Sequence, residues 1–271
     1  MDISDFDFTL PSNLIAQSPV FPRDESKLLS LINKNYENLF FKNLPDLLSP
    51  GDVIVTNDTK VIKANLVGFI NRRMIKITLQ YDQNQSYWMA FCKPAKKCNE
   101  KDFIEFSDKI NNKIEKKFNN GEILLNFNVS DAELMKFLSK FGSIPLPPYI
   151  KRRSKNDHEN YQTIFAKNLG AIAAPTAGLH FTNSVFNKIE RKGIKVTSIT
   201  LHVGAGTFLP VKTETIEKHK MHQEWCEVSQ EASETINQAK SKNKKIVCIG
   251  TTTLRTLESI AQSNDKIIPW K

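Results

Sequence analysis

Residues 174–182, A-P-T-A-G-L-H-F-T, place a histidine inside a neutral segment of a strongly charged chain. Pro175 and Gly178 can close a tight loop whose backbone N–H groups approach a ligand. A histidine in such a loop can act as a general base near neutral pH, and His180 is therefore a catalytic candidate. The residues alone favour a second interpretation, in which this histidine is a core side chain hydrogen-bonded to the backbone.

Residues 201–208, L-H-V-G-A-G-T-F, bring two glycines directly after an apolar strand. The spacing is similar to the start of a dinucleotide-binding fingerprint, but the third glycine is missing and a proline follows. A Rossmann cofactor site is therefore not predicted. Gly204 and Gly206 still allow the backbone to approach a ligand closely, and Thr207 adds a hydroxyl group.

Residues 248–255, C-I-G-T-T-T-L-R, run from a buried strand into the start of a helix. Free N–H groups and the helix dipole make such a start suitable for a carboxylate or a phosphate, and Arg255 could add a charge-assisted bond. Ordinary capping of the helix by Thr252 or Thr253 explains the same residues equally well.

Residues 218–225, K-H-K-M-H-Q-E-W, contain two histidines and a glutamate. Their spacing matches no zinc signature, so we expect no metal here. Acid–base chemistry by His222 and Glu224 is the preferred functional interpretation. For His219 and the lysines, solvated surface charge is the simpler explanation.

These loops need a framework, and the strand and helix patterns predict one in two parts. The last third of the chain alternates strands with helices, which is typical of an α/β domain. Thr182 is expected to cap the helix of residues 183–192, and Ser229 to open the helix of residues 230–240. Residues 66–130 instead hold successive short strand-like runs, which predict a small barrel or sandwich, and a helical pattern follows them. The stiff run P-L-P-P at 145–148 indicates a return to the first domain. We therefore expect an α/β domain of residues 1–65 and 145–271, split by an inserted β-rich domain of residues 66–144.

Composition limits the class of protein. The chain has 271 residues, 40% of them hydrophobic and 25% charged, which is ordinary for a soluble globular protein. Its longest apolar runs fall short of the roughly 20 residues that a membrane span needs, and the acidic start is unlike a signal peptide. We expect a cytoplasmic protein without a membrane partner. The four cysteines show no C-x-x-C spacing and are expected to be reduced thiols.

The charge balance points to a class of partner. With 38 basic and 29 acidic residues, the formal net charge is +9. Such an excess favours a polyanion such as RNA. A compositional bias towards lysine, asparagine and isoleucine accounts for the charge equally well.

Taken together and in order, the motifs resemble those of the S-adenosylmethionine:tRNA ribosyltransferase-isomerase family of queuosine synthesis. The segments that carry the resemblance cover the whole chain outside the inserted domain. They are D-F-D-F-T-L-P, P-R-D-E-S-K-L-L, G-D-V-I-V-T-N-D-T-K-V-I, P-L-P-P-Y-I, Y-Q-T-I-F-A, A-P-T-A-G-L-H-F-T, L-H-V-G-A-G-T-F, M-H-Q-E-W and G-T-T-T-L-R-T-L-E-S.

The resemblance implies a fold and a reaction. The fold is an L-shaped pair of an α/β domain and a β-barrel domain. The reaction moves and isomerises the ribosyl part of S-adenosylmethionine onto the 7-aminomethyl-7-deazaguanine base (preQ1) at the tRNA wobble position, giving epoxyqueuosine, adenine and methionine. The implied partners are this tRNA and S-adenosylmethionine, which serves as the ribosyl donor. No metal is implied, and we expect a monomer.

The resemblance and the chemistry above together suggest residue roles. An aminomethyl nucleophile must be neutral to attack, and a sulfonium suits aromatic faces better than lysines. His180 is the lead acid–base candidate, with His222 and Glu224 as its partners. The expected substrate-binding residues are Asp58, Thr176, Gly178, Phe181, His202, Gly204, Gly206, Thr207, Phe208 and Arg255.

The chain also departs from the family pattern. At residues 57–66 the family pattern usually reads N-D-T-R-V-I-P-A-R-L, whereas this chain has Lys60, Lys63 and Asn65. Lysine cannot reproduce a bidentate arginine contact. The sequence stops where the family continues with a further strand and a T-N-F-H-L-P-like segment, so a truncated product is expected. One alternative function is an inactive remnant that still binds RNA. The other is an RNA methyltransferase, which the broken glycine fingerprint disfavours.

Overall fold

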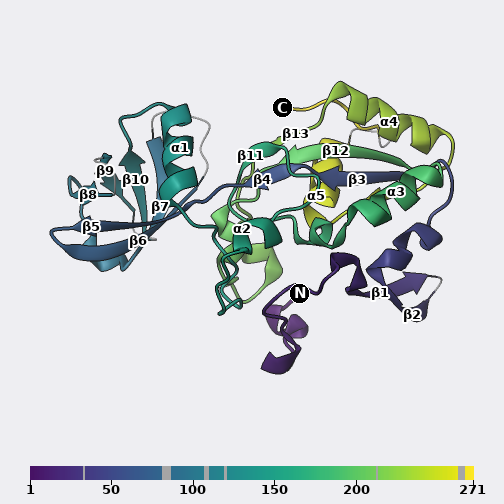
Figure 1. Cartoon of the computed structure of the whole chain (residues 1–271), viewed down its shortest axis with the longest axis horizontal. Helices are drawn as coiled ribbons and strands as arrows, with labels where there is room; N and C mark the ends of the chain where they lie inside the picture. The colour runs from purple at the N-terminus through teal and green to yellow at the C-terminus, as the bar shows by residue number, and fades with distance from the viewer. Residues whose placement is uncertain (33, 81–86, 107–109, 119–120, 212, 262–265) are drawn as a thin grey trace.

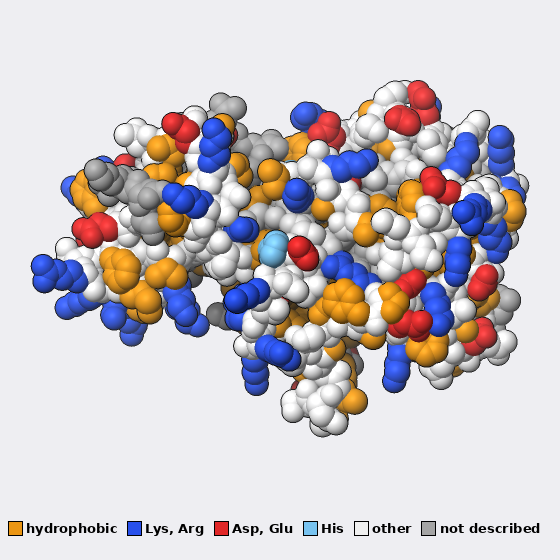
Figure 2. All heavy atoms as spheres, in the orientation of Figure 1, with side chains coloured by type: hydrophobic (Ala, Val, Ile, Leu, Met, Phe, Trp, Pro, Cys, Tyr) orange, Lys and Arg blue, Asp and Glu red, His pale blue; other side chains and the backbone are white. Residues whose placement is uncertain are grey.

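The computed structural model describes residues 1–32, 34–80, 87–106, 110–118, 121–211, 213–261 and 266–271. The chain forms two lobes that lie side by side along its long axis, and the N-terminal segment lies beside the larger lobe (Figure 1). Lys and Arg side chains are spread over the visible face of both lobes, and a group of them follows the lower edge of the smaller lobe (Figure 2). None of the described helices is long and apolar enough to cross a membrane.

The smaller lobe is a closed antiparallel barrel with the strand order β10-β7-β6-β5-β8-β9. Alternate side chains of each strand point inward, because successive residues of a strand face opposite sides. The helix α1 (Asp131–Phe141) packs Leu134, Phe137 and Leu138 against this barrel core, and Ser130 caps its first turn. The strands are β5 (Asn65–Ile70), β6 (Arg73–Leu79), β7 (Tyr87–Lys93), β8 (Phe103–Glu105), β9 (Asn111–Lys117) and β10 (Glu122–Asn126).

The larger lobe is built on a four-stranded sheet with the order β13-β12-β3-β14. The central strand β3 is buried at every residue and runs parallel to β12 and β14. Burial on both faces requires helices on both sides. The strands are β3 (Val53–Asn57), β12 (Lys195–Leu201), β13 (Cys226–Glu227) and β14 (Ile246–Cys248).

Three helices supply this cover. The helix α3 (Asn183–Arg191) packs on the face that carries Ile54, whereas α4 (Gln230–Ser241) and α5 (Thr251–Ile260) pack on the opposite face. Thr182 caps α3 and Ser229 caps α4, both as the sequence predicts. The lobe is therefore an α/β layer, and the predicted α/β fold with an added small barrel is confirmed.

The remaining elements surround the sheet. A hairpin of β1 (Lys27–Ile32) and β2 (Asn35–Phe40) precedes β3, and the short helix α2 (Asp157–Asn160) precedes β11. The strands β4 (Thr59–Val61) and β11 (Asn168–Ala171) pair in parallel at the connection to the barrel. Backbone hydrogen bonds between Asn65 and Ser143 join the two crossings between the lobes, close to the expected domain boundaries, which remain a prediction.

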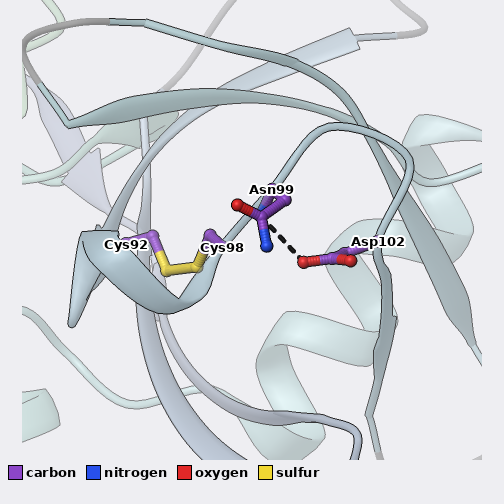
Figure 3. The surroundings of a disulfide bond; sticks show 4 residues. All are labelled: Cys92, Cys98, Asn99 and Asp102. Atoms are coloured by element: carbon purple, nitrogen blue, oxygen red, sulfur yellow. Dashed lines mark hydrogen bonds between the residues drawn. A yellow bond between two sulfur atoms is a disulfide. The ribbon is translucent and has the colours of Figure 1, made fainter.

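The expectation of four reduced cysteines is wrong for one pair. A disulfide bond joins Cys92, near the end of β7, to Cys98, six residues further on (Figure 3). A tight turn at Ala95–Lys97 separates them, and Asn99 then donates its backbone N–H to Asp102 at 2.8 Å. Both sulfurs belong to buried residues of the barrel core. The pairing depends on a turn that cysteine spacing does not reveal, whereas Cys226 and Cys248 are free thiols.

Candidate functional site

The carboxyl ends of β3, β12 and β14 meet at one edge of the sheet because the three strands are parallel. The buried side chain of Asn57 connects them. Its amide donates to the carbonyl of Leu201 at 3.0 Å and accepts the N–H groups of Leu201 and Thr59, both at 3.1 Å. It also lies 3.4 Å from the hydroxyl of Thr252. This residue fixes three loops at once, and sequence analysis does not single it out.

A cleft of about 770 Å³ opens above these strand ends, and we call it the central cleft. No charged side chain lines it in the described part of the chain. Of the predicted substrate-binding residues, Thr176, Thr207 and Phe208 lie in its wall. Its lining residues are Pro147, Pro148, Tyr149, Tyr161, Ala173, Ala174, Pro175, Thr176, Ala177, Val203, Thr207, Phe208, Leu209, Pro210, Gly250, Thr251 and Thr252.

The helix α5 begins in the wall of the central cleft. Gly250 precedes it with a φ of +87°, a value that favours glycine, and a Cβ there would lie 3.2 Å from that of Ala177. No side chain caps this start: Thr253 donates its hydroxyl back to the carbonyl of Ile249, and the Thr252 hydroxyl meets Asn57. The first-turn N–H groups and the positive end of the dipole are thus available to an anionic group.

His180 lies in a second cleft of about 590 Å³, which we call the His180 cleft and which it shares with Ser26 and Leu179. Its Nδ1 is 2.9 Å from the hydroxyl of Ser26, and that hydroxyl donates to the carbonyl of Arg23 at 2.8 Å. Since the single hydroxyl proton is used there, Nδ1 must be the donor in the contact with Ser26. The neutral ring then carries its lone pair on Nε2.

The environment favours this neutral form. Burial and, to a smaller degree, the positive charge of Arg23 lower the pKa of His180 below its usual 6.5. At neutral pH the imidazole is therefore unprotonated at Nε2 and able to accept a proton. The structure shows a histidine bonded to a side chain rather than to the backbone, unlike the core interpretation that the sequence alone favours.

The N-terminal segment P-R-D-E-S holds the His180 loop in place. Arg23 donates at 2.7 Å to the carbonyl of Gln162 and at 2.7 Å to that of Glu159. Asp24 accepts the hydroxyl of Thr182, the residue that caps α3 behind the loop, at 3.0 Å. These contacts join segments more than 130 residues apart, so spacing along the chain could not reveal them.

Two predicted substrate-binding residues near His180 pack within the fold, and their contact with a substrate remains a prediction. Phe181 is only 1% exposed and stacks edge-on against Phe41 and Phe165 in the core. Gly178 is buried against Thr163, where a Cβ would lie 3.0 Å from a methyl group. We therefore assign both residues to the support of the loop.

His222 and Glu224 line a third cleft, of about 760 Å³, which we call the His222 cleft. Arg255 reaches into it from α5 and forms an ion pair with Glu224 at 2.6 Å, while its other nitrogen donates to the carbonyl of His222 at 2.9 Å. The second carboxylate oxygen of Glu224 accepts the N–H of Gly204 at 2.9 Å. Because both of its carboxylate oxygens are engaged in these contacts, Glu224 is better suited to holding Arg255 and Gly204 in place than to transferring a proton.

Gly206 makes this arrangement possible. A Cβ at that position would lie 2.5 Å from the ring of His222, so the imidazole packs directly against the glycine backbone. At Gly204 the nearest atom to such a Cβ is a Glu224 oxygen at 3.9 Å. The two glycines of the G-A-G run are thus not equivalent.

His202 lies inside the fold and Asp58 is half-buried, and neither lines any of the three clefts. His202 is 7% exposed; its Nδ1 is 2.7 Å from the hydroxyl of Thr59, and its ring stacks on Trp225 at 4.8 Å. Burial lowers its pKa to about 4, so the ring is neutral at physiological pH. Asp58 accepts hydrogen bonds from Thr200 at 2.6 Å and Asn168 at 3.2 Å. Through these contacts, both residues help to hold the neighbouring loops in position.

The three clefts adjoin one another. The central cleft shares Thr176 and Tyr161 with the His180 cleft, and it shares Thr207 with the His222 cleft. His180 and His222 therefore line different clefts, each of which adjoins the central cleft through different residues. The described residues contain no group of three or more His, Cys, Asp or Glu side chains arranged to hold a metal.

Comparisons with known proteins agree on one family. A family model described as queuosine biosynthesis protein matches residues 3–270. The S-adenosylmethionine:tRNA ribosyltransferase-isomerase of Rickettsia bellii is 46% identical over 275 residues, which is 96% of this chain and 77% of that protein. The protein of the same name from Maricaulis maris is 42% identical over 273 residues, again 96% of this chain and 77% of its own length.

A solved structure is also similar. The crystal structure of an S-adenosylmethionine tRNA ribosyltransferase from Thermotoga maritima aligns with 95% of this chain and 73% of its own, at 28% identity and a TM-score of 0.45. The family match over nearly the whole sequence, together with relatives at 42% and 46% identity, decides the classification. The chain belongs to the queuosine biosynthesis protein family.

Proposed function

We propose that this chain transfers and isomerises the ribosyl group of S-adenosylmethionine onto preQ1 at the wobble position of tRNA, giving epoxyqueuosine. The reaction joins the aminomethyl nitrogen to the ribosyl carbon skeleton and breaks the bonds of that skeleton to sulfur and to adenine. Methionine and adenine leave. The names of the relatives support the two substrates, and the clefts support the division of roles that follows.

The observation that carries the proposal is the uncharged central cleft, which adjoins both histidine clefts. A sulfonium is repelled by lysine and arginine but is attracted by aromatic faces and carbonyl oxygens. Tyr149, Tyr161 and Phe208 supply such faces in the cleft wall. We place S-adenosylmethionine there, with its carboxylate at the start of α5, where free N–H groups favour an anion.

His180 is proposed as the base that takes a proton from the aminomethyl group. Ser26 fixes its tautomer, and its cleft adjoins the central cleft through Thr176. The preQ1 base must leave the RNA stack to reach this position, as bases do in other enzymes that act on a nucleobase. His222 lines the cleft that adjoins the central cleft through Thr207, and we propose that it contacts a leaving group there.

The test is a turnover assay. Purified chain is incubated with S-adenosylmethionine and tRNA carrying preQ1, and the digested nucleosides are weighed by mass spectrometry. Epoxyqueuosine together with free adenine and methionine is the expected result. S-adenosylhomocysteine with a methylated nucleoside would show a methyltransferase instead, and folded protein that binds the tRNA without any product would show an inactive remnant.

We further propose that the active form is a monomer that meets its tRNA in the cytoplasm. Light scattering on the purified chain, with and without tRNA, measures the first point directly. A mass of twice 30.9 kDa without RNA would contradict it.

A further inference from the structure

A groove of about 680 Å³ separates the barrel from the larger lobe, and we call it the inter-lobe groove. One wall is formed by β5, β6 and β7, and the other by residues 142–158. Among the residues that the structure describes, five cationic side chains line it, against one carboxylate. These are Lys63, Lys76, Lys93, Arg153 and Lys155, and the carboxylate is Asp157, which accepts the backbone N–H of Ser154 at 2.8 Å.

Two of the lysines face each other directly. Lys76 of β6 and Lys93 of β7 are register partners in the antiparallel pair, and both side chains are exposed. Neither amine has a hydrogen bond or an ion pair with any other residue that the structure describes. Like charges at directly opposed positions destabilise a sheet. An anion bound between them would turn this repulsion into attraction.

Apolar side chains lie beside these lysines on the same barrel face. Val67 is the register partner of Lys76 and is 51% exposed, and Met74 lies opposite Phe69 two pairs further along and is 54% exposed. Figure 2 shows Lys and Arg side chains with hydrophobic ones among them along the lower edge of the barrel lobe. Cations interleaved with apolar side chains are suited to nucleic acid, since the cations meet phosphates and the apolar groups meet sugars and bases.

The opposite wall adds cations from a different element. Residues 151–155, K-R-R-S-K, are all exposed, and Arg153 and Lys155 reach the groove from this run. Arg153 donates to the carbonyl of Ile144 at 3.2 Å, and Lys63 donates to that of Ser139 at 2.8 Å. These bonds fix the two charges without neutralising them. Positive charge on both walls matches a polyanion lying along the groove.

The groove is connected to the central cleft by one segment of chain. Residues 147–149 line the central cleft, and residues 153–155 line the groove. An RNA held in the groove is therefore beside the cleft that would receive its base. This position favours RNA over an acidic protein, which would gain nothing from lying next to that cleft.

We propose that the inter-lobe groove binds the phosphate backbone of the substrate RNA and thereby presents one base to the central cleft. The proposal rests on the proposed function for the identity of the RNA, but binding in the groove can be measured without turnover. The residues that carry it are Lys76 and Lys93 on the barrel, with Arg153 and Lys155 opposite.

The test compares two double variants of equal charge. Lys76→Gln/Lys93→Gln removes two charges from the groove, and Lys188→Gln/Lys242→Gln removes two from α3 and the end of α4, on the far side of the larger lobe. The probe is an unmodified, fluorescently labelled hairpin RNA with the sequence of a tRNA anticodon stem-loop. Its Kd is measured by anisotropy over a series of KCl concentrations.

We expect the groove variant to bind about tenfold or more weakly at low salt, and the slope of log Kd against log[KCl] to fall by about two, because each lost phosphate contact lowers it by about one. The control variant should bind like the unaltered chain. A third variant, Lys76→Arg/Lys93→Arg, keeps the charge and should restore binding. Equal binding by the groove and control variants would overturn the proposal.

The outcomes separate this proposal from the proposed function. Loss of RNA binding in the groove variant supports the groove even if no chain forms epoxyqueuosine. Conversely, if the groove variant forms epoxyqueuosine with an unchanged Kd for RNA and an unchanged KM for tRNA, the proposed role of the groove is wrong but the proposed function is not. If the groove variant loses binding to polyglutamate but keeps binding to RNA, the groove serves an acidic protein and the proposal is wrong.

Discussion

The hydroxyl of Ser26 lies 2.9 Å from Nδ1 of His180, although 154 residues separate them in sequence. Because Ser26 donates its own proton to the carbonyl of Arg23, this contact fixes which nitrogen of the imidazole carries hydrogen. The base Nε2 is thereby prepared before any substrate binds, as expected of a preorganised catalytic group.

Replacement of His180 by asparagine should reduce kcat by about 100- to 10,000-fold, the usual contribution of a general base. The thermal unfolding temperature should change little, since the side chain is only partly buried. In the unaltered enzyme, kcat/KM should begin to fall only below pH 6.5 as the pH is lowered. The reason is that burial and the charge of Arg23 lower the pKa of His180, so that its imidazole is still neutral at pH 6.5. The assay is epoxyqueuosine formation across a pH series.

Ser26 provides the discriminating control for that experiment. Ser26→Ala removes the tautomer restraint but keeps the imidazole, so kcat should fall less than in His180→Asn, by about tenfold. Ser26→Thr retains a hydroxyl group and should keep most of the activity. Normal turnover in His180→Asn would exclude the proposed base.

The second prediction concerns the buried imidazole of His202, whose folded pKa of about 4 lies below the unfolded value of 6.5. Between these pH values the unfolded state binds more protons, so the free energy of unfolding should fall as the pH drops from about 6.5 towards 4. The full effect is on the order of 1–3 kcal/mol. His202→Gln can keep a hydrogen bond to Thr59 without titrating and should flatten this dependence.

Urea unfolding at a series of pH values measures the effect, with His158→Gln as the matched control, since His158 is exposed. If the His202 and His158 variants retain the same pH dependence as the unaltered chain, burial of His202 does not control acid stability.

The sequence predicts the framework well where local chemistry is sufficient. The threonine cap of α3 and the serine cap of α4 lie where the pattern places them. The convergence of the three loops follows from parallel strands sharing one edge. The sequence pattern does not indicate the strand β9, because N-N-K-I-E-K-K offers only Ile114 as an apolar inward residue. Pairing with β8 and β10, rather than propensity, makes this segment a strand.

The candidate site was less predictable, since its contacts join distant segments. The motif at 174–182 identifies His180 but not its bond to Ser26, and the N-D-T run suggests Asp58 whereas Asn57 makes the central contacts. Phe181 shows the reverse difficulty. An aromatic residue next to a catalytic candidate suggests a ligand contact, but its side chain points into the core because it precedes the cap of α3.

The third prediction tests the ion pair between Glu224 and Arg255. Its two side chains are 12% and 38% exposed, so water screens it only in part. Glu224→Gln or Arg255→Met alone should each cost about 1–2 kcal/mol of stability, less than a fully buried pair. In a double-mutant cycle by urea unfolding, the double variant should be more stable than the sum of the single losses predicts. Strict additivity would mean that the two charges do not interact.

The last prediction separates the two glycines of the G-A-G run. In Gly206→Ala the new methyl group would meet the His222 ring at 2.5 Å, so the imidazole must move, and kcat/KM should fall about 10- to 100-fold. In Gly204→Ala the methyl group has free space and the N–H that Glu224 accepts is retained, so activity should remain within about twofold. Steady-state kinetics on both variants provides the comparison. Equal losses would show that backbone freedom, rather than contact with His222, requires glycine in this loop.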